Sequence, residues 1–436
     1  MADDLDELSG GLGRMLSTAR LAGRLGRKTA GRVLFGARSE AAGKGSAEAD
    51  GSDATVAAAR RLVAQMSQLK GLVMKAGQIA SYMPGSMPPA AQRVLAELQA
   101  SSTPMAFHRI DEMLAAELGA PGRALFESID ERPFAAASIG QVHRAVHGGA
   151  AVAVKVQYPG VEDAIRSDLR MVGAIARLSA IGSPIDAGAL AGELRDRLLE
   201  ECDYHREADN QRLFAQLLAP IDGARVPEVI AARSSRRVLT TALADARPLA
   251  AAPADQAARD RAGQIIFRAC FELLWRRCIY NADPHPGNYL VDADGSVTFL
   301  DFGCVRRFEP AMIATWKAMA RAILSGDRAG FVAGFRALGL VGRERKFDWD
   351  YQWGAMRFLY APFLEPGFRH HAEHVQKSFG VLMFDNPNRL RIAMPPEWLF
   401  LNRLQWGLNA VLAQLAAAGP WREILDELIA APLDPA

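Results

Sequence analysis

The alternation of apolar and polar residues between positions 133 and 159 constrains the fold more than any other feature. Two strand-like stretches, QVHRAVH and AVAVKVQ, flank a Gly-Gly-Ala turn. This pattern predicts an antiparallel β-hairpin. Helical periodicity precedes the hairpin at 54–83 and follows it at 161–180 and 187–218, and the pattern is helical after residue 311. A mixed region followed by helices predicts an α+β fold with two lobes.

Composition and charge narrow the class of protein. The chain has 436 residues, of which 50% are hydrophobic and 23% are charged, as in folded globular proteins. The formal net charge is only +2, so we expect no nucleic-acid partner. The four cysteines form no CxxC motif and predict no zinc site. An acidic start, with no apolar run of roughly 18 residues, predicts a cytoplasmic protein without a signal peptide or transmembrane helix.

The N-terminal region differs in charge from the rest of the chain. Between residues 11 and 38 there are seven basic residues and no acidic residue. This stretch is either a solvated leader or a helix that binds a membrane surface or a partner. A linker rich in small and polar residues follows. The expected domains are a flexible leader and linker at 1–53, a helical extension at 54–130, a first lobe at 131–245 and a helical second lobe at 246–436.

The segment NADPHPGN at 281–288, followed by Asp-Phe-Gly at 301–303, carries the strongest chemical signal. Two short strands are predicted between them, and a hairpin would bring Asn288 and Asp301 to one end of a sheet. An amide and a carboxylate oxygen suit Mg²⁺, which also takes phosphate oxygens from a substrate. Asp283 is placed to accept a hydroxyl proton or to orient a water. A plain polar turn would explain one of these acids but not the second.

Lys155 is the next candidate. Strand alternation places it on the face opposite the valines of AVAVKVQ. Glu201 continues a stripe of leucines at helical spacing, so we expect it on the buried side of the 187–218 helix. A buried acid is costly unless it is paired. Each residue alone is typical of a surface charge, but together they predict a Lys155–Glu201 ion pair of the kind that holds nucleotide phosphates.

An alanine-rich segment precedes this strand. Ala135, Ala136, Ala137 and Ser138 stand where kinases have a glycine-rich loop over the phosphates. Alanine gives the backbone less freedom than glycine, so we expect altered phosphate contacts there. Read in isolation, the segment is only the start of a helix or loop.

Taken in order, these motifs resemble the UbiB (ADCK-type) family of atypical kinases over roughly residues 55–310. The matching segments are KAGQ at 75–78, the alanine-rich segment, VAVKVQYPG at 152–160, ECD at 201–203, EADN at 207–210, ADPHPGN at 282–288 and DFG at 301–303. The resemblance implies a protein-kinase-like bilobed fold with an N-terminal helical extension and an all-helical C-lobe.

The resemblance also implies residue roles, with ATP and Mg²⁺ as ligands. Lys155 would contact the nucleotide phosphates with Glu201 as its partner. Asp283 would be the catalytic-loop aspartate, with Asn288 and Asp301 as the magnesium ligands. The regulatory residues that it implies, which would enter the active site from the extension or meet it there, are Lys75, Gln78 and Asp203.

These observations favour an ATP-dependent atypical kinase or ATPase that supports isoprenoid-quinone or related lipid metabolism. We expect it to act peripherally on the inner membrane face, with anionic lipid or isoprenoid-lipid enzymes as partners. No Ala-Pro-Glu segment follows Asp-Phe-Gly, so protein phosphorylation is not expected. Two alternatives remain: a nucleotide-sensing scaffold, and a small-molecule phosphotransferase of the aminoglycoside or choline type. The phosphotransferase reading gives no account of Lys75 and Gln78.

Overall fold

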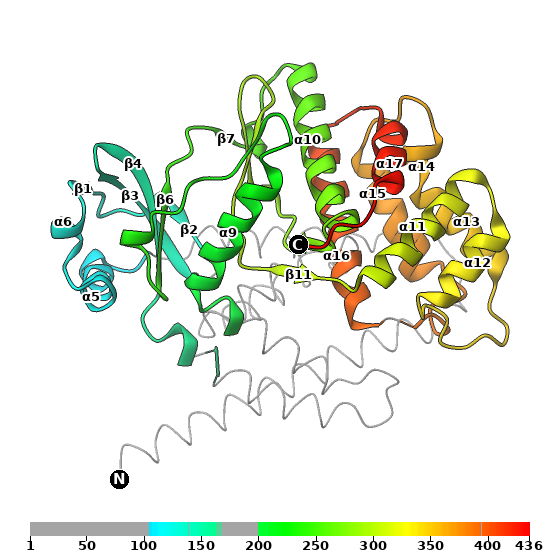
Figure 1. The fold of residues 1–436 in the computed structure, drawn as a ribbon, viewed down its shortest axis with the longest axis horizontal. Helices are drawn as coiled ribbons and strands as arrows, with labels where there is room; N and C mark the ends of the chain where they lie inside the picture. The colour runs from blue at the N-terminus through cyan, green and yellow to red at the C-terminus, as the bar shows by residue number, and fades with distance from the viewer. Residues whose placement is uncertain (1–103, 138, 164, 167–198, 394) are drawn as a thin grey trace, which may run out of the picture. The chain divides into compact units, whose positions relative to one another are not determined.

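The computed structural model describes residues 104–436 apart from 138, 164, 167–198 and 394 (Figure 1). The chain divides into two compact units, 1–55 and 56–436, and every described residue belongs to the second. The expected leader, most of the helical extension and most of the two helices after the hairpin therefore lie outside the described residues.

The predicted hairpin forms the centre of the first sheet. Its strands are β3 (Gly140–His147) and β4 (Ala150–Gln157), which pair antiparallel with Val142 opposite Lys155. Gly148 and Gly149 make the turn with φ of +61° and +75°, a conformation that glycine adopts without strain. The other strands of this sheet are β1 (Ser128–Ile129) and β2 (Ala135–Ala136), both beside β3, and β6 (Val238–Ala242), beside β4.

The two faces of this sheet pack against different helices. The valines at 152, 154 and 156 form one core with α5 (Phe107–Leu118) and α6 (Gly122–Leu125), which lie beside the sheet in Figure 1. Leu239 belongs to a second core with residues of α9 (Tyr204–Leu218). Lys155 lies opposite Leu239 in the pairing of β4 with β6, so its side chain is on the face of the sheet that packs against α9. The helix α5 and strand β1 fall within the range expected for the extension, yet they pack with the first-lobe sheet.

A second sheet carries the two strands between the NADPHPGN and Asp-Phe-Gly segments. Its order is β5 (Ala224–Arg225), β10 (Val297–Phe299), β9 (Tyr289–Val291) and β7 (Arg247–Pro248). The predicted second hairpin is confirmed, because β9 and β10 pair antiparallel with Phe299 opposite Tyr289. A separate pair joins β8 (Ile279–Asn281) to β11 (Val305–Arg307). Two short 3₁₀ turns, η2 (Leu249–Ala251) and η3 (Pro286–Asn288), lie beside the second sheet, and a third, η1 (Ala231–Arg233), contacts β6 of the first sheet.

The second lobe is mostly helical. Its first helix, α10 (Gln256–Trp275), begins at Asp255, whose side chain accepts hydrogen bonds from the first turn. The remaining helices are α11 (Pro310–Ser325), α12 (Arg328–Ala337), α13 (Trp349–Leu359), α14 (Ala361–Leu364), α15 (Ala372–Phe379) with the π-helical turn η4 (Gly380–Phe384), α16 (Pro396–Gln414) and α17 (Trp421–Ala430).

Aromatic residues fill the core of this lobe. Phe331 and Trp421 are almost fully buried, and Trp316 and Trp353 pack against the same cluster. Aromatic side chains from helices far apart in sequence thus meet in one core. Among the residues that the structure describes, no helix is both long and apolar enough to cross a membrane.

Candidate functional site

One asparagine joins the loop that contains Asp283 to the Asp-Phe-Gly segment. The side-chain oxygen of Asn281 accepts the N–H of Asp283 at 3.1 Å. Its amide nitrogen donates to the carbonyl of Asp301 at 2.7 Å. Since one planar amide holds both contacts, Asp283 and Asp301 are held in a fixed relation before any ligand binds.

The β9–β10 hairpin brings the two expected metal ligands together. Asn288 lies just before β9 and Asp301 just after β10, and the N–H of Leu300 donates to the carbonyl of Asn288 at 2.9 Å. The amide nitrogen of Asn288 donates to the carbonyl of Asp283 at 2.9 Å. Its side-chain oxygen is then the atom suited to a cation. This placement agrees with the hairpin argument from sequence.

Asp301 has an uncommon backbone conformation. Its φ is +58°, in the left-handed region that non-glycine residues rarely adopt. Its carboxylate accepts a hydrogen bond from the N–H of Gly303 at 3.1 Å. The Asp301 side chain is 37% exposed. Strained backbone of this kind is often found at functional sites. Here it belongs to a residue whose partly exposed carboxylate lies 4.0 Å from the ammonium of Lys155.

Lys155 connects the first-lobe sheet with α9 and Asp301. Its ammonium donates to both carboxylate oxygens of Glu207, at 2.7 and 2.9 Å. It lies 4.0 Å from the carboxylate of Asp301 and 4.9 Å from the ring centroid of Tyr204. Only 16% of the Lys155 side chain and 6% of the Glu207 side chain are exposed. A buried, doubly hydrogen-bonded pair of this kind has a well-defined geometry.

The predicted Lys155–Glu201 ion pair is wrong, because the carboxylates that meet Lys155 are those of Glu207 and Asp301. The expected 187–218 helix is interrupted at residues 201–203, and α9 begins at Tyr204. Asp203 caps the new helix by accepting the N–H of His205 at 3.0 Å. Glu201 therefore lies in the break before α9, where helical spacing does not determine the direction of its side chain.

The charges in this cluster shift one another's pKa. Burial works to lower the pKa of Lys155, but the carboxylates of Glu207 and Asp301 outweigh it and hold that pKa well above the ordinary lysine value. Burial, with Asp301 and Glu201 adding to it, raises the pKa of Glu207 to about 7 although Lys155 opposes the shift. Two carboxylates and one ammonium carry a net negative charge when all are ionised. A further positive charge near Asp301, such as a metal ion, would therefore be favourable.

The helix α9 also holds the Asp-Phe-Gly segment. The amide nitrogen of Asn210 donates to the carbonyl of Phe302 at 2.9 Å. The Phe302 ring lies 5.1 Å from that of Phe214 and is almost fully buried. The element that supplies Glu207 therefore also fixes the backbone next to Asp301.

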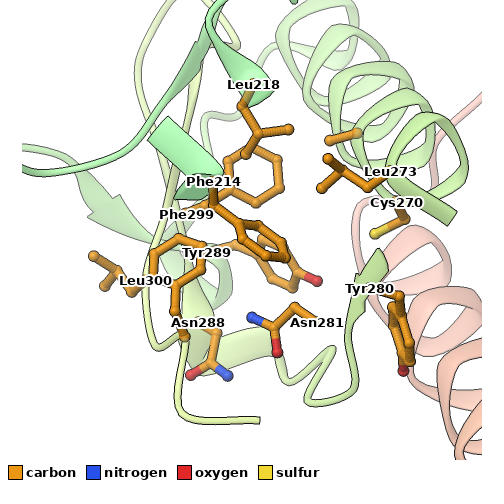
Figure 2. Close-up of a pocket in the computed structure, with 12 residues that line it drawn as sticks. Phe214, Leu218, Cys270, Leu273, Tyr280, Asn281, Asn288, Tyr289, Phe299 and Leu300 are labelled. Atoms are coloured by element: carbon orange, nitrogen blue, oxygen red, sulfur yellow. The ribbon is translucent and has the colours of Figure 1, made fainter. Parts of the chain in front are cut away.

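A small apolar cavity lies behind the catalytic segment. Figure 2 shows Phe214, Tyr289 and Phe299 gathered beside the amides of Asn281 and Asn288. Its volume is about 20 Å³, which is close to the space of one water molecule. The aromatic side chains around this cavity pack beside the two amides. The cavity itself is too small for a nucleotide.

The helix α16 packs closely against the loop that contains Asp283 and Pro284. A Cβ atom on Gly407 of α16 would lie 2.5 Å from Cγ of Pro284 and 2.8 Å from its carbonyl oxygen. Real Cβ atoms do not come so close, so only glycine lets α16 meet the loop at this point. The residue after Asp283 is therefore held from the second lobe.

Two residues of the alanine-rich segment form the short strand β2 beside β3. Ala135 and Ala136 pair with β3, and the N–H of Ala137 donates to the carbonyl of Gly140 at 2.9 Å. A Cβ on Gly140 would lie 2.2 Å from the carbonyl of Val156, so the strand after the turn requires glycine. The side chains of Ala135 and Ala136 are exposed. Ser138, like the predicted regulatory residues Lys75 and Gln78, lies outside the described residues.

Four contributing residues are absent from the sequence-based prediction: Glu207, Asn281, Asn210 and Tyr204. Glu207 and Asn210 belong to the EADN motif at 207–210. The buried positions of α9 begin at Tyr204 and include Glu207 and Gln211, which is helical spacing from the Asp203 cap. Counting from that cap would have placed Glu207 on the buried face. Asn281 contacts one backbone group two residues away, at Asp283, and one twenty residues away, at Asp301, and the second contact has no local signal in the sequence.

The donor set fits a magnesium–nucleotide complex. Among the residues that the structure describes, no group of three or more His, Cys, Asp or Glu side chains could by itself hold a metal ion. Asp301 and Asn288 together offer one carboxylate and one amide oxygen. Mg²⁺ is commonly bound by so few protein ligands when phosphate oxygens and waters complete its shell.

Comparisons with known proteins agree with this geometry. Residues 97–333 match the family described as the ABC1 atypical kinase-like domain. The chain is 34% identical over 403 residues to the mitochondrial atypical kinase COQ8B of Rattus norvegicus, covering 88% of this chain and 74% of the relative. It is 27% identical over 384 residues to the mitochondrial atypical kinase COQ8 of Saccharomyces cerevisiae, covering 85% of this chain and 76% of the relative.

A solved structure shows the same fold. It is the complex of Rv3197 with erythromycin from Mycobacterium tuberculosis, with a TM-score of 0.66 and 27% sequence identity over 88% of this chain and 99% of that chain. The expected kinase-like α+β fold is thereby confirmed. From its matched domain and its relatives, this chain belongs to the ABC1 atypical kinase-like family, the UbiB/ADCK type.

Proposed function

We propose that the protein binds ATP with Mg²⁺ and transfers the terminal phosphoryl group to water or to a hydroxyl acceptor. The observation that carries this proposal is the convergence of Lys155, Glu207 and Asp301. The first residue comes from β4, the second from α9 and the third from the end of β10. This arrangement places one ammonium and one partly exposed carboxylate where phosphates and a metal ion can meet.

Each side chain has a role that its contacts support. Lys155 neutralises phosphate charge, and Glu207 orients it through two hydrogen bonds. Asp301 and the side-chain oxygen of Asn288 hold the metal ion, which when bound neutralises charge on the phosphate oxygens. Asp283 takes the acceptor proton as the acceptor oxygen bonds to the terminal phosphorus and the bond to ADP breaks.

We further propose that turnover supports isoprenoid-quinone or related lipid metabolism at a membrane surface. This part rests on membership of the family and on the basic stretch between residues 11 and 38. A function assigned from fold and family alone needs a direct test. The partners that we propose are anionic lipid and enzymes that act on isoprenoid lipids.

The test is phosphate release from ATP and Mg²⁺ by the purified protein, with and without anionic vesicles. The matched control is Asp283→Asn, which keeps the shape of the side chain but removes the proton acceptor. Release that depends on Asp283 and increases with vesicles is the expected result. Release that is equal in the two proteins would contradict the assigned role of Asp283.

The scaffold alternative has one observation in its favour. The turn at Ala135–Ala137 is closed by its own backbone pairing, and its residues are alanines. Nucleotide binding without any phosphate release, in the presence of Mg²⁺ and vesicles, would favour that alternative over catalysis. Equilibrium binding of a fluorescent ATP analogue separates the two outcomes.

A further inference from the structure

A basic pocket lies in the second lobe, and none of its residues belongs to the nucleotide site. It is open to solvent, with a volume of about 490 Å³. Two segments line it, one after α12 and one after η4. The residues that matter for the argument are Arg343, Asp385, Asn386, Arg389, Leu390 and Arg391. Three guanidinium groups thus share one pocket with a single carboxylate.

Backbone contacts hold the two segments together. The N–H groups of Gly342 and Arg343 both donate to the carbonyl of Arg391, at 2.8 and 3.0 Å. Val341 and Ile392 form a β-bridge beside them. The guanidinium of Arg391 donates to the carbonyl of Pro387 at 2.6 Å, which closes the turn between residues 387 and 391. The basic residues are therefore brought together by a fixed backbone frame.

Two groups in this frame are not satisfied by the described protein. Asn386 is 2% exposed, and its side-chain oxygen accepts the N–H of Asn388 at 2.8 Å, which fixes the orientation of the amide. Within the described residues, its amide nitrogen has no hydrogen-bond partner. In the same part of the chain, the exposed Arg343 side chain makes no ion pair within 4.0 Å. A buried donor without an acceptor, such as the Asn386 amide, calls for an explanation, and negative charge nearby would favour both groups.

The neighbouring Leu390 adds an apolar contact. It lies between Arg389 and Arg391 in sequence and is 75% exposed, the higher of the two values for exposed large hydrophobic residues in the described chain. Guanidinium groups bind phosphate oxygens through paired N–H donors. An exposed leucine beside such groups suits the boundary between lipid headgroups and acyl chains.

The geometry points to a second ligand site, separate from the nucleotide site, that binds a phosphate group through Arg343 beside the buried amide of Asn386. The phosphate can come from a phospholipid headgroup or from a soluble phosphate ester. Leu390 contributes only in the first case, because only a lipid offers an acyl surface. The inference does not depend on phosphoryl transfer, since binding is measured without nucleotide.

The first experiment measures sedimentation of the full-length protein with phosphatidylglycerol vesicles. We expect Arg343→Gln to weaken binding about fivefold, as for one basic residue at an anionic surface. The matched control is Arg345→Gln, an exposed arginine in the same segment that does not line the pocket. Asp385→Asn removes the single carboxylate and should strengthen binding. Sedimentation of each variant without vesicles separates a gain of binding from aggregation.

The source of the phosphate is distinguished by two further measurements. If the ligand is a lipid, Leu390→Asn also weakens vesicle binding. If it is a soluble ester, glycerol 3-phosphate binds in calorimetry, this binding weakens in Arg343→Gln, and Leu390→Asn has no effect.

Two results would overturn the inference. One is an equal loss of vesicle binding in Arg343→Gln and Arg345→Gln, which would indicate diffuse surface charge without a pocket. The other is the absence of binding to both vesicles and glycerol 3-phosphate. ATP hydrolysis without vesicles should be unchanged in Arg343→Gln, so failure here leaves the proposed nucleotide chemistry intact.

Discussion

The pairing of Lys155 with Glu207 is the residue-scale feature that most directly supports nucleotide chemistry. Glu207→Gln keeps one hydrogen bond but removes the charge that orients Lys155. We expect phosphate release to fall about 100-fold, the effect of misplacing a group that contacts the reacting phosphates. Glu201→Gln is the matched control, since Glu201 is not the carboxylate that Lys155 meets. Steady-state kinetics of the two variants test the pairing, and a larger loss in Glu201→Gln would contradict it.

The raised pKa of Glu207 has a consequence for stability. Its ordinary value is 4.5, and burial raises it to about 7 in the folded protein. Below about pH 4.5 the carboxyl is protonated in both states, so its contribution to stability is fully present. That contribution is lost as the pH rises through about 7, because the unfolded chain ionises more easily.

This linkage predicts a pH-dependent difference between two proteins. The free energy of unfolding of Glu207→Gln, relative to the native protein, should rise by about 1–3 kcal/mol between about pH 5 and about pH 8. Urea unfolding at several pH values measures the difference. A difference that is constant over this range would show that Glu207 has an ordinary pKa.

At the scale of elements, the contact between α16 and the catalytic loop gives a further prediction. Gly407→Ala places a methyl group within 2.5 Å of Pro284, so the helix or the loop must shift. We expect a fall in kcat of about tenfold or more, because displacement of a catalytic group slows the reaction more than it weakens ATP binding.

The control for this variant is Gly354→Ala. Gly354 is also a helical glycine, but nothing lies within 4 Å of a Cβ placed there. Alanine in such a position stabilises a helix by about 0.5–1 kcal/mol. Kinetic assays and thermal melting of both variants separate the loop contact from the general effect of removing a glycine. Equal kcat values would show that Pro284 needs no support from α16.

The elements show how far local sequence patterns reach. Alternation and turn residues were sufficient to predict both hairpins, and the second hairpin correctly brought Asn288 and Asp301 together. The prediction that Glu201 lies on the buried face of a continuous helix was wrong. Helical spacing of apolar residues does not reveal a break in the helix such as the one before Asp203. The contact of Gly407 with Pro284 joins residues more than a hundred positions apart, and no local rule encodes it.

At the scale of the whole molecule, binding of ATP and Mg²⁺ should raise the free energy of unfolding. Mg²⁺ and ATP at about 100 times the dissociation constant add about 2.7 kcal/mol to the free energy of unfolding. We expect Asp301→Asn to lose the part of this gain that requires Mg²⁺ while keeping some stabilisation by ATP alone. Thermal shifts with ATP, with and without EDTA, measure the two parts. A full Mg²⁺-dependent shift in Asp301→Asn would contradict the metal assignment.

The anchoring of Phe302 also bears on the pharmacology of this protein. A compound that needs the space of this aromatic ring would first have to displace it. Here its carbonyl is held by Asn210, its ring packs on Phe214, and the preceding carbonyl is held by Asn281. Displacing the ring would break these three contacts together. Compounds that leave Phe302 in place are therefore the better starting point for selective chemical probes.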